Sequence, residues 1–218
     1  MVAATLPIVV CQTTAAVPTT TTSLPGSVSV SIPTSEAKQG NLAVYTDETG
    51  RLMLVGPTVG WTCNGSFGAD GSGLLALAPV GTTVPLSGLT WHLPMSSTTQ
   101  AIVAMESGAS PVQGAVLVCP FFSTAQAAAQ QNLGKSCAGN SPSQERMFKV
   151  STVQAGFEDP PGVAGAGYPS GGQNSANGIA LYQPKPTEAS AYLATCTLPA
   201  AQRDLCTAVL NQFAATFG

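Results

Sequence analysis

The chain has 218 residues, of which 44% are hydrophobic and 8% are charged, where about 25% charged residues is typical of a globular domain. This length is enough for one large domain or two small ones with a real core. Ten carboxylates against seven basic residues give a net charge of −3, and no Lys/Arg cluster occurs. Without such a cluster the chain cannot form the basic surface that binds a phosphate backbone, so we do not expect nucleic acid as a partner.

We expect residues 1–26 to form an extended N-terminal segment and residues 27–218 to form a single α+β domain. Residues 5–11 are a short β-prone run. The Thr- and Pro-rich residues 12–26 cannot form a helix. Residues 27–33 alternate between apolar and polar side chains, which predicts a half-buried strand.

Two hairpins are predicted next. The first has its turn at residues 47–50, between two apolar runs. The second lies within residues 60–81, and its turn is either Asn64-Gly65 or Asp70-Gly71, since both pairs favour two-residue loops. We prefer Asp70-Gly71 because it leaves a longer first strand.

The second half of the chain combines strands with a short helix. Residues 100–107 and 112–122 are apolar segments predicted as buried strands, and residues 144–157 have β-branched residues in their second half. Ser123 as N-cap, a run of good helix formers and Gly134 as C-cap predict a helix between them.

The C-terminal residues predict a strand, 190–199, that is followed directly by a helix. Pro199 suits the first turn of that helix. Apolar residues recur every four positions and give the helix one apolar face: Leu205, Val209, Phe213 and Phe217. The fold class predicted is α+β, with a mainly antiparallel β-sheet, two helices in the C-terminal half and three disulfides.

The cysteines predict these disulfides. Six cysteines are spread over the chain without a C-x-x-C pair and with a single histidine, so zinc binding is poorly supported. An even number of cysteines then points to disulfides formed in an oxidising compartment. In a strand followed by a returning helix, Cys196 and Cys206 would face each other at the same height across the interface. Cys119 and Cys137 flank the predicted Ala/Gln helix. The expected pairs are Cys11–Cys63, Cys119–Cys137 and Cys196–Cys206.

The N-terminus lacks the basic region and the long apolar core of a signal peptide. We expect that an export signal has been removed and that the protein is secreted or extracytoplasmic. No run approaches 18 apolar residues, so no membrane-spanning helix is predicted. Self-association is favoured, because weakly charged surfaces repel one another little.

A glycine-rich stretch at residues 158–178 is the leading candidate for a contact region. Its 21 residues include six glycines and three prolines and show no helical or strand period. A segment of this kind inside a compact domain is usually a functional loop or disordered. Candidate binding residues are Tyr168, Ser170 and Asn174 in this loop, together with Trp91.

Catalytic candidates are few. His92 is the only histidine, so a serine or cysteine hydrolase would need it as its base. No serine lies in a G-x-S-x-G motif. Glu158 and Asp159 could bind a cation or share acid–base work, although neighbours in an extended chain point to opposite sides. The plainer interpretations are a histidine without a catalytic role and an acidic pair that begins a loop.

Cofactor and metal motifs are also unconvincing. The glycines of residues 165–172 do not match a dinucleotide-binding loop, because a strand follows them where a helix is required. Residues around Asp70 lack the further acidic ligands of a calcium loop. We therefore expect no cofactor and no metal. Some aromatic residues could form a sugar-stacking platform, although core packing is the commoner role: Trp61, Trp91, Tyr168, Tyr182 and Tyr192.

The motifs GWTC, GADGS, FEDPPG, PSGG, ANG and CTLP…LCTAVLNQF lie within residues 40–218. Over most of this range the chain resembles a group of secreted bacterial proteins with no assigned activity. The resemblance implies an exported, disulfide-bearing domain and supplies no catalytic residues.

We interpret the sequence as a secreted, disulfide-stabilised binding or cell-surface structural domain for an unknown extracellular or cell-envelope ligand. One alternative is a secreted hydrolase that uses His92 or the pair Glu158 and Asp159. The other is a self-assembling envelope component.

Overall fold

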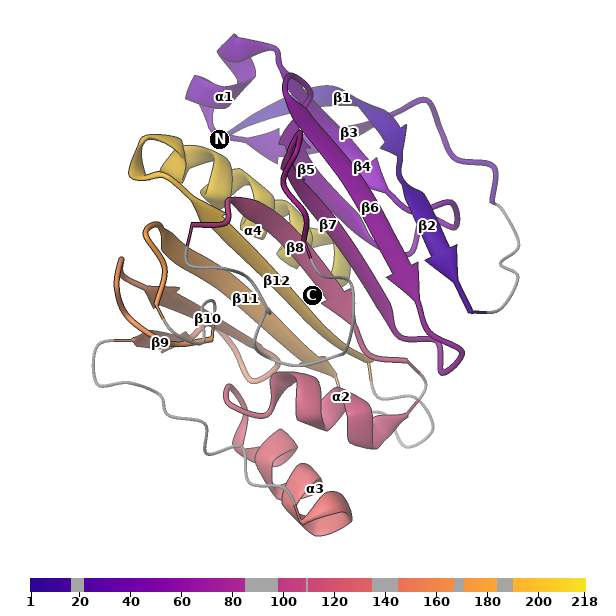
Figure 1. Cartoon of the computed structure of the whole chain (residues 1–218), viewed down its shortest axis with the longest axis vertical. Helices are drawn as coiled ribbons and strands as arrows, with labels where there is room; N and C mark the ends of the chain where they lie inside the picture. The colour runs from indigo at the N-terminus through magenta and orange to yellow at the C-terminus, as the bar shows by residue number, and fades with distance from the viewer. Residues whose placement is uncertain (17–21, 85–97, 109, 135–144, 167–170, 184–189) are drawn as a thin grey trace.

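Two β-sheets form the body of the protein in the computed structural model (Figure 1). In spatial order the four-stranded sheet contains β3 (Ser27–Ile32), β1 (Val2–Val10), β4 (Leu42–Thr46) and β5 (Met53–Pro57). The eight-stranded sheet contains β2 (Gln12–Ala15), β6 (Trp61–Phe67), β7 (Gly73–Pro79), β8 (Ala101–Glu106), β12 (Ser190–Leu198), β11 (Ser175–Gln183), β10 (Gln154–Asp159) and β9 (Arg146–Lys149). The structure describes residues 1–16, 22–84, 98–108, 110–134, 145–166, 171–183 and 190–218.

The helices are α1 (Thr34–Gln39), α2 (Pro111–Val118), α3 (Ser123–Leu133) and α4 (Arg203–Phe217), and a 3₁₀ turn, η1 (Ala200–Gln202), precedes α4. The α+β class is therefore confirmed. Among the described strand pairs only β1–β4 and β2–β6 are parallel, so the sheets are mainly antiparallel as predicted. The prediction of two helices is wrong, because the described residues contain four, and α1 lies in the first half of the chain.

The eight-stranded sheet is the central layer, and apolar side chains cover both of its faces. Its central strand β8 is buried along its whole length, because alternate residues enter two different cores. Ile102 points into the core shared with the four-stranded sheet and α4, whereas Val103 and Met105 point into the core under α2 and α3. This explains why the apolar run of β8 is continuous and not alternating.

The segment 112–122, predicted as a buried strand, is instead the helix α2 followed by a turn. Ser110 is its N-cap and accepts a hydrogen bond from the Gln113 backbone N–H (3.5 Å). Pro111 occupies the first turn, where its missing N–H costs nothing. A short apolar run fits a buried strand and a buried helix equally well. The Ser-Pro pair before it is a helix N-terminal signal and favours the helix.

Most of the other local predictions are confirmed. The hairpins β4–β5 and β6–β7 form, and the second has its turn at Asp70-Gly71, while Asn64-Gly65 lies inside β6. Helix α3 ends at Gly134, which has a φ of 60° as a left-handed C-cap requires. Its N-cap is Phe122 and not Ser123, and no side chain caps it.

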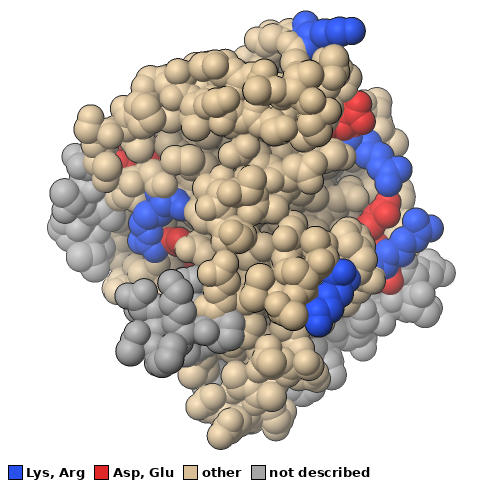
Figure 2. Space-filling model, turned by 180° about the vertical axis from the view of Figure 1, so that it is seen from behind, with Lys and Arg blue, Asp and Glu red and all other residues tan. Residues whose placement is uncertain are grey.

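The surface carries few charges. Figure 2 shows Lys, Arg, Asp and Glu side chains as small separate groups on a largely uncharged face. None of the described helices is both long and apolar enough to cross a bilayer.

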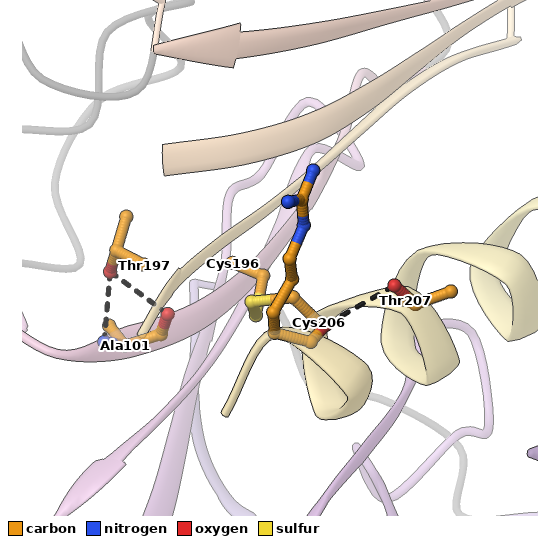
Figure 3. Close-up of a disulfide and its surroundings, with 6 residues drawn as sticks. Ala101, Cys196, Thr197, Cys206 and Thr207 are labelled. Carbon is orange, nitrogen blue, oxygen red and sulfur yellow. Dashed lines mark hydrogen bonds between the residues drawn. A yellow bond between two sulfur atoms is a disulfide. The ribbon is translucent and has the colours of Figure 1, made fainter. Parts of the chain in front are cut away.

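Two of the three predicted disulfides are present among the described residues, Cys11–Cys63 and Cys196–Cys206. The second joins β12 to the first turn of α4, and beside it the Thr197 hydroxyl bonds both the N–H and the C=O of Ala101 on β8 (3.0 Å each; Figure 3). The third predicted pair, Cys119–Cys137, includes a residue outside the described part of the chain and stays a prediction.

We expect the two disulfides to stabilise the fold unequally. The partners are separated by 52 residues in Cys11–Cys63 and by 10 in Cys196–Cys206. Loop-closure entropy then predicts that replacing both cysteines by alanine lowers the free energy of unfolding by about 4 kcal/mol for the first pair and about 3 kcal/mol for the second. Urea melts of both double variants measure this. Thr62→Ala, an exposed change next to Cys63, is the control; a larger loss for the shorter loop would contradict the entropic account.

Candidate functional site

Four of the residues predicted to form a site lie outside the described part of the chain: Trp91, His92, Tyr168 and Ser170. Their roles stay predictions. Asn174 is described and lies half-buried immediately before β11. Whether it acts together with the other candidate binding residues stays a prediction, because they lie outside the described residues.

Glu158 and Asp159 belong to β10 and not to a loop, so the connection between β10 and β11 comprises residues 160–174. As adjacent residues of one strand, the two carboxylates point to opposite faces of the sheet. Glu158 lies near Arg146 (3.7 Å) and Arg203 (3.6 Å). Asp159 is fully buried. This arrangement does not support joint acid–base work by the pair.

The glycine-rich connection packs closely on Asp159. A Cβ added at Gly165 would lie 2.3 Å from Asp159 Oδ1, so no other residue fits there without a shift. Gly162 N–H donates to the Gly172 carbonyl (2.7 Å), and Ala166 N–H donates to Glu145 Oε1 (2.9 Å). The described parts of the connection are therefore held against the sheet.

A buried charged cluster joins the two sheets. Arg51, from the β4–β5 turn, pairs with Glu106 at the end of β8, donates to the Gly71 carbonyl and lies 5.0 Å from the Phe67 ring centroid. The nearby Asp47 carboxylate is fully buried and accepts hydrogen bonds from backbone N–H groups within its own turn. Burial raises the pKa of Glu106 to about 7, and Asp47 adds to the increase while Arg51 opposes it.

A carboxyl group with a pKa near neutrality is a common feature of active sites. Here, however, the Glu106 carboxylate already pairs with Arg51, and the same guanidinium donates to the Gly71 carbonyl. The interaction links the β4–β5 turn to the β6–β7 turn and to the end of β8. We therefore interpret this cluster as a structural link between the sheets.

A better candidate site surrounds Trp61, the first residue of β6. The first hollow has a volume of about 300 Å³ and lies among α1, the start of β4, the end of β5 and the η1–α4 junction. Its lining combines apolar residues (Leu42, Pro57, Val59, Trp61, Ala201, Leu205) with polar ones (Glu36, Gln39, Asn41, Gln202).

A second hollow, of about 380 Å³, also has Trp61 in its wall. It follows the crossing from β1 to β2 and the Cys11–Cys63 disulfide, and it includes Tyr45 and Thr58. We call the two hollows together the Trp61 site. Both hollows combine polar and apolar surface in similar amounts. In ligand sites the polar groups fix the orientation of the ligand and the apolar surface packs against it.

Two polar groups of the first hollow make no bond within the described chain. Glu36 is 8% exposed, and its carboxylate makes no hydrogen bond or ion pair with any residue of the described chain. Burial raises the pKa of Glu36, and Asp204 raises it further. Gln202 Oε1 is a fully buried atom without a hydrogen-bond partner. Leaving such groups unpaired is costly, so a ligand that pairs with them gains affinity.

Local sequence explains why Glu36 lies here. Residues 34–39 form one short helix, and Gly40 ends it with a φ of 67°. Helix α1 meets the start of α4, where Ser35 donates to Asp204 Oδ2 (2.7 Å). Sequence reasoning missed α1 and Glu36, although T-S-E-A-K-Q-G offers good helix formers, an acidic residue in the first turn and a C-terminal glycine.

No protein-family model, curated protein or solved structure matches the chain. Within the described residues, no three His, Cys, Asp or Glu side chains come together as a metal site. The site therefore has to be interpreted from its own chemistry.

The buried cluster makes stability depend on pH. Because the pKa of Glu106 is raised from 4.5 to about 7, the folded protein holds a proton between these values that the unfolded chain has lost. The stabilisation from this group is complete below about pH 4.5 and disappears as pH rises through about 7, a change on the order of 3 kcal/mol. Urea melts from pH 4 to pH 8 should show this fall in the wild type and lose it in Glu106→Gln.

Glu48→Gln, on the same turn as Asp47, is the matched control and should follow the wild-type curve. If Glu106→Gln and the wild type keep parallel stability curves across this range, Glu106 does not titrate as described.

Proposed function

We propose that the protein is a secreted, disulfide-stabilised binding domain and that the Trp61 site receives its ligand. The observation that carries this proposal is the first hollow, where a nearly buried, unpartnered carboxylate lies with an unpaired amide oxygen and a tryptophan. Unsatisfied buried groups are rare in native proteins and call for an explanation. A ligand that completes their hydrogen bonds is the simplest one.

Binding is favoured over catalysis by the residues that line the first hollow. They supply one carboxyl group and three amides, with no hydroxyl, thiol or imidazole group among them. Nucleophilic catalysis needs a nucleophile and a base within hydrogen-bond reach. The alternative of a hydrolase depends on His92, which lies outside the described residues, and it stays a prediction.

An extracytoplasmic location is supported by the disulfides. Both Cys11–Cys63 and Cys196–Cys206 lie where they fix the architecture of the domain. Structural disulfides form and persist in oxidising compartments, whereas cytosolic thiols are usually kept reduced.

A self-assembling envelope component is the second candidate. The outermost strand of the eight-stranded sheet, β9, carries the exposed apolar side chains Met147 and Phe148, and the exposed Val150 follows it. An edge strand of this kind pairs readily with a second copy. Light scattering at increasing concentration should then show growth that Phe148→Lys prevents. A wild type that stays monomeric would exclude this candidate.

Blocking the first hollow tests the binding function. Ala201 is exposed and lines this hollow, so Ala201→Trp should fill it with an indole while leaving the fold intact. We expect saturation-transfer NMR with a library of small amines, sugars, carboxylates and neutral aromatics to detect ligands of the wild type that Ala201→Trp no longer binds.

Ala215→Trp, at an exposed position near the other end of α4, is the matched control and should retain these ligands. Thermal melts establish that both variants fold. Equal binding by the wild type and Ala201→Trp, or no binding by the wild type at all, would place the function elsewhere.

A further inference from the structure

The chemistry of the first hollow also indicates which ligand it takes. We propose that the group entering it is an organic cation, an ammonium or a guanidinium on an apolar stem. This inference rests on the proposed binding function and specifies its ligand class.

The charges around Glu36 are the first part of the argument. Helix α1 packs against β1, β4 and α4. The strands β1 and β4 contain no charged side chain, and α4 brings a second acid, Asp204, toward Glu36. The cations nearest in sequence are directed elsewhere, because Arg203 is exposed and lies near Glu158, and Lys38 is exposed on α1. The carboxylate is therefore not neutralised by any described residue.

The acceptor groups are the second part. The Glu36 carboxylate and Gln202 Oε1 are both hydrogen-bond acceptors, and no residue of the described chain donates to either of them. An ammonium or a guanidinium supplies three or five N–H donors and no acceptor, which matches this set. Bonds between a charged donor and a carboxylate are about twice as strong as neutral ones.

The apolar lining is the third part. Trp61 contributes an indole ring to the same hollow, and tryptophan is the strongest aromatic partner for a cation. Leu42, Val59 and Leu205 offer apolar surface for a methylene stem. The volume of about 300 Å³ accommodates one such side chain or a small free amine.

Other ligand classes fit less well. A phosphate or carboxylate would bring a third negative charge beside Glu36 and Asp204. A neutral sugar could hydrogen bond and stack on Trp61, but it would leave the repulsion between the two carboxylates unchanged. A cation relieves that repulsion, so the electrostatics of the site favour it.

Titration with small probes tests the ligand class. Agmatine and n-butylammonium carry the cation, and 1-butanol is their neutral counterpart. We expect both cations, and not 1-butanol, to shift the indole N–H signal of Trp61 and the side-chain carboxyl signal of Glu36 in NMR spectra. In Glu36→Gln the affinity for agmatine should fall about tenfold or more, because one charge-assisted contact is lost.

Glu48→Gln is the matched control for the loss of one negative charge, and it should bind agmatine like the wild type. A second measurement does not depend on any variant. Binding of a cation should weaken as pH falls and Glu36 is protonated, whereas binding of 1-butanol should not change with pH. A blocked arginine tripeptide in a further arm shows whether the cation belongs to a peptide or to a free amine.

The outcomes separate this inference from the proposed function. If neutral probes bind the wild type and lose affinity in Ala201→Trp while agmatine does not bind, the site is real and the cation assignment is wrong. Equal agmatine affinity in the wild type and Glu36→Gln also overturns the assignment. If no probe binds the first hollow, the proposed function itself fails.

Discussion

One residue, Cys11, holds the two sheets together where the chain passes from one to the other. Strand β1 ends at Val10 in the four-stranded sheet, and β2 begins at Gln12 in the eight-stranded sheet. Between them, Cys11 donates its N–H to the Thr46 carbonyl on β4 (2.8 Å) and bonds its sulfur to Cys63 on β6. A residue with such partners in both sheets fixes their relative position. Trp61, two residues before Cys63, is thereby held at the junction where the two hollows meet.

The opposite wall of the site depends on the second disulfide. Cys196–Cys206 fixes the first turn of α4 against β12, and α4 packs into the core between the sheets through residues such as Phe213. The start of α4 then faces α1, and the Ser35–Asp204 hydrogen bond joins residues 169 positions apart. The Trp61 site therefore depends on long-range contacts between short segments of the chain. Its geometry follows from the two disulfides and the Ser35–Asp204 hydrogen bond, which position the two sheets, α1 and α4.

The difference between local and long-range information explains what the sequence could predict. The Asp70-Gly71 hairpin, the Gly134 cap and the β12–α4 unit are encoded by residues close together, and all were predicted. The strand predicted at 112–122 failed because a short apolar run does not distinguish strand from helix. Glu36 and Gln202 could not be recognised as a pair, because only the packing of α1 against α4 brings them into one hollow. The burial that raises the pKa of Glu36 cannot be read from the sequence.

The treatment of buried acids distinguishes the site from the rest of the interior. Of the ten acidic residues in the sequence, four are buried among the described residues: Glu36, Asp47, Glu106 and Asp159. Asp47 accepts backbone N–H bonds within its turn, Glu106 pairs with Arg51, and the Gly165 backbone encloses Asp159. Each of these three is used to fasten a turn, a sheet or a connection. Glu36 makes no hydrogen bond or ion pair in the described chain, and burial raises its pKa. This difference is why we propose that Glu36 serves a ligand and not the fold.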